Sequence, residues 1–156
     1  MGMQPEQTGS CLNATIGLHL RADEREVRRV LNDIKTRFDG HLSPEDSGSL
    51  ELALAEVLNN IVEHAYAGRA PGQVSVSLML ASAGDALLCR VEDDGHPMPG
   101  MALPEGQMQP VAERIEDLAE GGWGWALIRT LTDEIVYERQ AGRNRLHFRL
   151  PLSKAS

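Results

Sequence analysis

Residues 55–66 read AEVLNNIVEHAY, and this stretch has the spacing of a helix with two distinct faces. At about 100° per residue, Glu56, Asn60 and His64 form a polar stripe beside an apolar face. The apolar face consists of Leu50, Leu54, Val57, Ile61 and Ala65. An Asn amide oxygen can hold Mg²⁺, a hard cation that takes oxygen ligands, and a Glu one turn earlier can accept a proton from an attacking hydroxyl. The same spacing also occurs on the solvated flank of an ordinary helix.

A second group of candidate residues follows an alternating apolar run that carries Leu87, Cys89 and Val91. Asp93 keeps the phase of that run, so its carboxylate is expected on the inward face, where burial is costly without a hydrogen-bond partner. The exocyclic amine of adenine is a suitable donor, whereas guanine presents a carbonyl at the same position. Gly95 allows a base and the backbone to approach closely. An Asp-Asp-Gly triplet is also typical of a simple turn, but the strand phase of Asp93 favours the adenine interpretation.

A third group is the glycine-rich run Gly121–Gly124, which precedes a helix with Trp123, Ala126, Leu127 and Leu131 on its predicted apolar face. Backbone NH groups and the positive end of a helix dipole suit phosphate at this position. Glycines there also serve as ordinary hinges between a loop and a helix. The phase of the helix predicts Trp123 in the core.

The remaining patterns predict one α+β domain. The segments are a strand over residues 12–20, helices over 23–40 and 43–66, and strand hairpins over 74–91 and 135–150. Asp23 and Ser43 are placed to cap the two helices. Residues 96–120 contain four prolines and little apolar periodicity, so we expect a long loop that acts as a lid over the site. Residues 1–10 are expected to be disordered.

The length and net charge of the chain limit the classes of protein to which it can belong. A chain of 156 residues suits a single domain, residues 1–156, with its own core. A formal net charge of −8 argues against a non-specific nucleic-acid surface, which needs a basic face. No apolar stretch approaches the roughly 18 residues of a membrane span, and the amino terminus has no signal pattern. We therefore expect a cytoplasmic protein with reduced thiols at Cys11 and Cys89.

The three groups together resemble the GHKL ATP-binding superfamily, and within it the bacterial anti-sigma factor serine kinases of the RsbW type. Residues 56–66 are similar to its N box, and Asp93, Gly95 and Pro97 to its adenine motif. Residues 121–134 are similar to its glycine box and the helix that follows. Asn144 stands where relatives carry a polar residue near adenine.

This resemblance implies a two-layer α/β sandwich, with a mostly antiparallel mixed sheet and about three helices on one face. It implies ATP and Mg²⁺ as cofactors, with Glu56 as the catalytic base and Asn60 as the metal ligand. The residues it implies for nucleotide binding are Asn60, His64, Asp93, Gly95, Gly122, Gly124 and Asn144. The implied reaction is transfer of the ATP γ-phosphate to a Ser or Thr of a STAS-type anti-anti-sigma protein. A sigma factor as second partner and a homodimer are implied as well, without direct contact to nucleic acid or membrane.

Two alternatives stay open at this point. The chain is either a kinase or a nucleotide-gated binding module of the same fold without phosphotransfer. The catalytic half of a histidine kinase is disfavoured, because no histidine lies in the helical hairpin that a phosphoacceptor needs. Arg114 is the one Lys or Arg among residues 96–120, amid five acidic residues, which predicts slow turnover or dependence on a bound partner.

Overall fold

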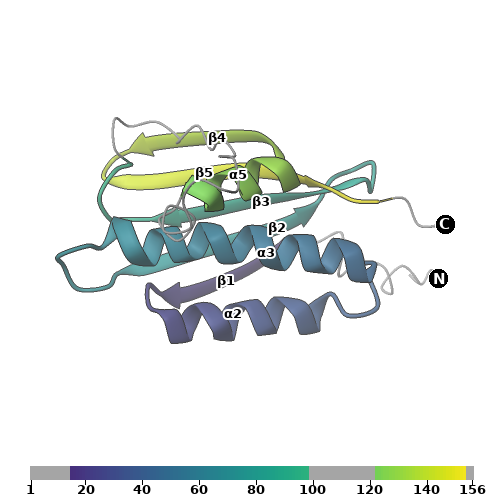
Figure 1. Cartoon of the computed structure of the whole chain (residues 1–156), viewed down its shortest axis with the longest axis horizontal. Coiled ribbons are helices and arrows are strands. Elements are labelled where there is room, and N and C mark those ends of the chain that lie inside the picture. The colour runs from purple at the N-terminus through teal and green to yellow at the C-terminus, as the bar shows by residue number, and fades with distance from the viewer. Residues whose placement is uncertain (1–14, 99–121, 154–156) are drawn as a thin grey trace, which may run out of the picture.

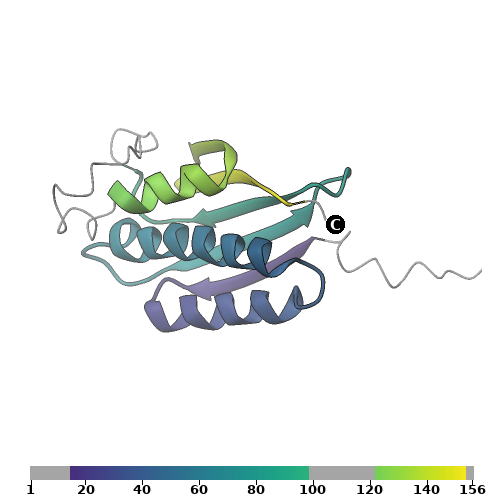
Figure 2. The same cartoon turned by 45° about the vertical axis from the view of Figure 1, so that its right-hand side comes forward.

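The computed structural model describes residues 15–98 and 122–153. In chain order the elements are β1 (Ile16–Arg21), α2 (Glu24–Arg37), α3 (Pro44–Asn60), the π-helical turn η2 (Ile61–Ala65), β2 (Gln73–Leu80), β3 (Ala86–Asp93), α5 (Gly122–Leu131), β4 (Asp133–Gln140) and β5 (Arg143–Pro151). The strands form one sheet in the order β1-β2-β3-β5-β4, and each of its four pairings is antiparallel. The helices α2, α3 and α5 cover one face of this sheet, as Figures 1 and 2 show. The predicted two-layer α+β architecture is confirmed, in a sheet whose described pairings are all antiparallel.

Both predicted helix starts are confirmed. The Asp23 carboxylate accepts a hydrogen bond from the Glu26 backbone NH at 2.9 Å, and the Ser43 hydroxyl accepts one from the Asp46 NH at 3.0 Å. These caps satisfy NH groups that the first turn of a helix leaves unpaired. Pro44 lies in the first turn of α3, where its missing NH costs nothing. The helix predicted to end near Tyr66 continues from α3 through η2 and ends at Ala65, one residue before that boundary.

The core lies between the sheet and the helices. The buried residues of α3 and η2 include all five of the predicted apolar face, Leu50, Leu54, Val57, Ile61 and Ala65. Alternate residues of the central strands point at the helices, including the free thiol of Cys89, whose pKa is raised by burial. No helix within the two described ranges is long and apolar enough to cross a membrane.

The predicted phase of α5 is wrong. The buried side chains of this helix are Trp125, Ala126 and Ile128, whereas Leu127 and Leu131 are half-buried. The helix is apolar on most of its circumference, so periodicity alone does not fix which side faces the core. Its contacts with α3 and β4 decide the face instead. The side chain of Trp123 lies outside the described part, and its predicted core position stays a prediction.

Candidate nucleotide site

The three groups of candidate residues gather at one end of the molecule. The carboxyl end of α3, the end of β3 and the start of α5 lie together there (Figures 1 and 2). The helix α5 packs beside α3, which brings residues far apart in sequence to the same end. The long segment that follows β3, predicted as a lid over residues 96–120, falls for the most part outside the described residues.

Asp93 is a buried carboxylate at the inward face of β3, as its strand phase predicts. Its side chain is 3% exposed. The Oδ1 atom accepts two hydrogen bonds at 2.8 Å, from the backbone NH of Gly95 and from Nδ2 of Asn144. No donor from the described ranges reaches Oδ2. A buried carboxylate oxygen without a donor is costly, so this atom is where a ligand amine would be bound most favourably.

The protonation of Asp93 reflects opposing effects. Burial raises the pKa of Asp93, and the neighbouring charge of Asp94 raises it further. The hydrogen bonds from Asn144 and Gly95, together with the positive charge of Arg139, oppose this rise. These three groups therefore favour the ionised form that can accept a hydrogen bond from a base.

Asn144 lies directly opposite Asp93 in the pairing of β3 with β5 and is 6% exposed. Its Nδ2 donates to Oδ1 of Asp93 and to the carbonyl of His96, both at 2.8 Å. Its Oδ1 accepts from the Tyr137 hydroxyl at 2.5 Å and from Nη1 of Arg139 at 3.0 Å. Asn144 therefore contacts Asp93 directly, and its expected place near adenine stays a prediction.

Gly95 is required by a close contact between β3 and the end of the long helix. A Cβ atom at this position would collide with the carbonyl oxygen of Ala65, and would lie 2.7 Å from the Ala65 Cβ. The next residue, His96, donates its backbone NH to that same carbonyl at 2.6 Å. Glycine is thus needed at residue 95 for packing against η2, in addition to the predicted approach of a base.

A second contact fixes the same turn from the other side. The Tyr66 hydroxyl donates to Oδ1 of Asp94 and accepts from the Asp94 backbone NH, the latter at 3.1 Å. Burial and the Asp94 carboxylate raise the pKa of Tyr66. Gly72 leaves room for this pair, because a Cβ there would lie 2.7 Å from both Asp94 Oδ1 and Tyr66 Cε1. The residues after Asp93 are therefore held on two sides.

The polar stripe of the long helix lies at the border of the core. Glu56 and Asn60 are half-buried, whereas the side chain of His64 is 64% exposed and lies near Glu63. Nδ2 of Asn60 donates to the Glu56 carbonyl at 2.8 Å. Within the described residues, no donor reaches the other end of this amide, the Oδ1 atom of Asn60. An amide oxygen is a ligand type that Mg²⁺ accepts.

The described ranges contain no group of three or more His, Cys, Asp or Glu side chains that would hold a metal by themselves. A magnesium ion bound with a nucleotide takes few protein ligands and completes its shell with phosphate and water oxygens. A single amide oxygen such as that of Asn60 fits this role.

The glycine run differs from its predicted position. The helix α5 begins at Gly122, so Gly122 and Gly124 form its first turn rather than a loop before it. The first turn of a helix still has NH groups without partners in the helix, which is the feature that suits phosphate. Gly121 lies outside the described residues.

Tyr137 and Arg139 contact Asn144 from β4, and neither was among the residues predicted for the site. A signal was present, because Ile135, Tyr137 and Arg139 alternate on one face of a strand that pairs with β5 across the turn at Gly142. That register places Arg139 directly opposite Asn144. The pairing of the two strands of this hairpin therefore indicates the contact between Arg139 and Asn144, whereas the sequence of β4 alone does not.

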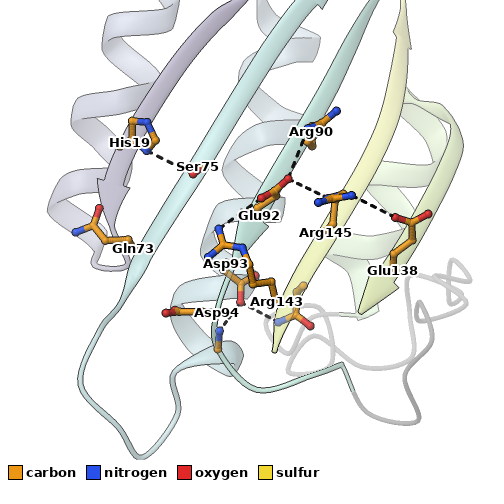
Figure 3. Close-up of polar contacts among 12 residues, drawn as sticks. His19, Gln73, Ser75, Arg90, Glu92, Asp93, Asp94, Glu138, Arg143 and Arg145 are labelled. Atoms are coloured by element: carbon orange, nitrogen blue, oxygen red, sulfur yellow. Dashed lines mark hydrogen bonds and ion pairs between the residues drawn. The ribbon is translucent and has the colours of Figure 1, made fainter. Parts of the chain in front are cut away.

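The opposite face of the sheet carries a separate ladder of charges, shown in Figure 3. Glu92 lies within 2.9 to 3.6 Å of three arginines, which are Arg90, Arg143 and Arg145. Glu92 is adjacent to Asp93 in the strand, so its side chain points to the other side of the sheet. These arginines are therefore not part of the candidate site.

Comparison with known proteins shows the family to which the chain belongs. Residues 19–150 match the histidine kinase-like ATPase domain. The chain is 31% identical over 120 residues to the serine-protein kinase RsbW of Bacillus pumilus, and the match covers 74% of this chain and 71% of that protein. It is 32% identical over 118 residues to the RsbW of Halalkalibacterium halodurans, with 74% and 68% covered. The chain belongs to the family of histidine kinase-like ATPase domains, the GHKL type of ATP-binding protein.

Within that family the chain is of the RsbW type, as its sequence motifs predicted. A crystal structure of the RsbU and RsbW domains of a Mycobacterium tuberculosis protein superposes with a TM-score of 0.64 at 20% identity. It covers 92% of this chain, and this chain covers 34% of that longer one. A histidine kinase domain from Erythrobacter litoralis superposes with a TM-score of 0.50 at 23% identity, covering 82% of this chain and 60% of that one. At these identities the two structures support the fold alone.

Proposed function

We propose that this chain is an ATP-dependent protein serine/threonine kinase and anti-sigma regulatory factor. It transfers the ATP γ-phosphate to a Ser or Thr of a STAS-type anti-anti-sigma protein and holds a sigma factor in a partner switch. The observation that carries the proposal is the buried Asp93 carboxylate, whose Oδ1 accepts two hydrogen bonds while no donor within the described residues reaches its Oδ2. The serine-protein kinase names of the relatives support the reaction class.

Adenine is recognised at Asp93. Oδ2 accepts a hydrogen bond from the exocyclic amine, while Oδ1 stays engaged with Gly95 and Asn144. Guanine would place a carbonyl oxygen against the same carboxylate, so the site discriminates by repulsion between two acceptors.

The phosphates lie toward the long helix and the first turn of α5. Asn60 would hold the magnesium ion through Oδ1, and a bound magnesium ion neutralises charge on the phosphates. The backbone NH groups at Gly122 and Gly124 are the phosphate ligands at the start of α5. His64 lies at the exposed end of the polar stripe and would contact the nucleotide from the solvent side.

Glu56 is the proposed general base. Its carboxylate lies one turn before Asn60 on the same stripe and makes no hydrogen bond with the described residues that would occupy it. The substrate hydroxyl oxygen attacks the γ-phosphorus as its proton passes to Glu56. The bond from the γ-phosphorus to the β–γ bridging oxygen breaks, and ADP leaves with that electron pair. Most of the acceleration comes from positioning and charge neutralisation.

The partners follow from the RsbW relationship and are part of the proposal. The substrate is a small STAS-domain protein, and the second partner is a sigma factor bound by a homodimer of this chain. Phosphorylation of the antagonist would release it and leave the kinase free to hold the sigma factor. The reaction uses no direct contact with nucleic acid or membrane and takes place in the cytoplasm.

Transfer of radiolabel tests the proposal. The purified chain is incubated with γ-labelled ATP, magnesium and a STAS-domain protein from the same organism. We expect label on the STAS protein with wild type and none with Glu56→Gln, while Glu51→Gln on the same helix transfers normally. Wild-type protein that binds ATP but labels no STAS protein would contradict the kinase assignment. It would favour the alternative, a binding module whose affinity for its partner is set by the nucleotide alone.

A further inference from the structure

We propose that Tyr137 and Arg139 of the edge strand β4 are positioning residues that set the purine selectivity of the site. They act by fixing the orientation of the Asn144 side-chain amide, which in turn holds the Asp93 carboxylate. Neither side chain needs to touch the nucleotide for this role. The inference rests on the proposed binding of ATP at Asp93.

The Asn144 amide is saturated. A primary amide can donate two hydrogen bonds and accept two, and Asn144 makes all four. Its two acceptors are Oδ1 of Asp93 and the carbonyl of His96, both at 2.8 Å. Its two donors are the Tyr137 hydroxyl at 2.5 Å and Nη1 of Arg139 at 3.0 Å. A fully satisfied buried amide has one favourable orientation.

Rotating the amide by 180° would reverse every one of these contacts. The amide oxygen would then face the His96 carbonyl and the Asp93 carboxylate, both of which lack a hydrogen to donate when Asp93 is ionised. The NH₂ group would face Arg139, whose guanidinium has no acceptor. The tyrosine hydroxyl could adapt by accepting, but the arginine cannot. Arg139 therefore fixes the orientation of the Asn144 amide from one side, and the Asp93 carboxylate fixes it from the other.

The same two side chains also hold the backbone that follows Asp93. Nη1 of Arg139 donates to the carbonyl of Gly95 at 2.7 Å, and the Tyr137 hydroxyl accepts from the Met98 NH at 3.0 Å. Together with the Asn144 bond to the His96 carbonyl, these contacts fix residues 95–98 against β4 and β5. The carboxylate and the backbone next to it are thus held in place from the edge of the sheet.

The consequence for a ligand concerns Oδ2 of Asp93. With Oδ1 occupied by Asn144 and Gly95, the carboxylate presents a single fixed acceptor. If the Asn144 amide were free to turn, the carboxylate could rotate or take up a proton, and a protonated oxygen would donate to the carbonyl of guanine. Loss of the β4 contacts should therefore reduce discrimination against guanine as well as affinity for adenine.

Titration calorimetry of the full chain with ATP and with GTP, in the presence of magnesium, tests this inference. The variants are Arg139→Met and Tyr137→Phe, and the matched control is Arg143→Met. Arg143 belongs to the same hairpin, but its side chain pairs with Glu92 on the other face of the sheet. We expect each variant to weaken ATP binding about tenfold and to lower the ratio of ATP to GTP affinity by a similar factor. Arg143→Met should leave both values unchanged.

Arg139→Lys serves as the conservative variant, since a lysine amine keeps the charge and can still donate to the Asn144 oxygen. Its purine selectivity should lie closer to wild type than that of Arg139→Met. A uniform loss of affinity for both nucleotides, or an unchanged ratio in folded Tyr137→Phe and Arg139→Met, would overturn the inference while ATP binding by wild type stands. If wild type binds neither nucleotide, the proposed function itself fails and the inference fails with it.

Discussion

Asn144 donates its side-chain amide to the Asp93 carboxylate at 2.8 Å, directly across the pairing of β3 with β5. Both residues lie on the inward face of the sheet, where the neighbouring positions Val91 and Leu146 are apolar and buried. These two buried polar residues in register, at the end of a sheet next to a polar helix stripe, are the feature on which the proposed nucleotide site depends. This hydrogen bond and the one from the Gly95 NH both engage Oδ1 of Asp93, and no donor in the described part of the chain reaches Oδ2.

The first prediction concerns the cost of keeping Asp93 ionised. Because the pKa of Asp93 is raised in the folded protein, its ionisation lowers stability at pH values above that pKa. Asp93→Asn removes this cost and should raise the Tm of the ligand-free protein at pH 7. The gain should shrink as the pH is lowered toward the ordinary aspartate pKa of about 3.9, because wild type then takes up the proton itself.

Differential scanning calorimetry from about pH 7 down to about pH 4.5 measures this difference, since that range approaches the ordinary aspartate pKa from above. Asp39→Asn, at an exposed residue of the turn after α2, does not remove a buried charge and should show no comparable gain. A lower Tm for Asp93→Asn at pH 7 would mean that the carboxylate stabilises the ligand-free fold, and the prediction would be wrong.

The second prediction concerns Gly95. Alanine at this position would push its Cβ into the Ala65 carbonyl, so Gly95→Ala should cost about 2 kcal/mol of unfolding free energy. Gly48→Ala is the matched control, because Gly48 lies inside α3 and a Cβ atom added there would meet open space. That change should stabilise the protein by about 0.5 to 1 kcal/mol. Urea unfolding of the three proteins gives both values, and equal stabilities would refute the packing role of Gly95.

The third prediction concerns metal binding at Asn60. Asn60→Ala should weaken binding of ATP in magnesium by about tenfold, but should have little effect on ATP binding in EDTA. The neighbouring amide Asn59 points in a direction about 100° away around the helix, so Asn59→Ala should behave as wild type. An equal loss of affinity with and without metal would show that Asn60 contacts the nucleotide or the fold, and not the ion.

Much of the fold could be predicted from the sequence because its signals are local. Strand alternation placed Asp93 inward, helical spacing placed Glu56 beside Asn60, and Asp23 and Ser43 capped their helices as expected. The phase of α5 could not be predicted, because a helix that is apolar on most sides takes its orientation from α3 and β4. Packing between distant segments overrides the periodic signal in such a helix.

The supports of the site were harder to predict than the candidate residues. The contact between Gly95 and Ala65 joins segments that are distant in the sequence, and no local sequence pattern in either segment predicts it. Tyr137 and Arg139 reach Asn144 only through the register of the last hairpin. A motif indicates candidate binding side chains, whereas the neighbours that orient those side chains depend on strand pairing and on the ends of helices.

Calorimetric titration of ATP with magnesium into wild type and Asp93→Asn tests the central claim most directly. We predict measurable binding to wild type, and a loss of at least about a hundredfold in the variant, because its amide presents a donor where adenine also presents one. Equal affinities for the two proteins, in samples shown to be folded, would contradict the assignment of Asp93 as the adenine acceptor.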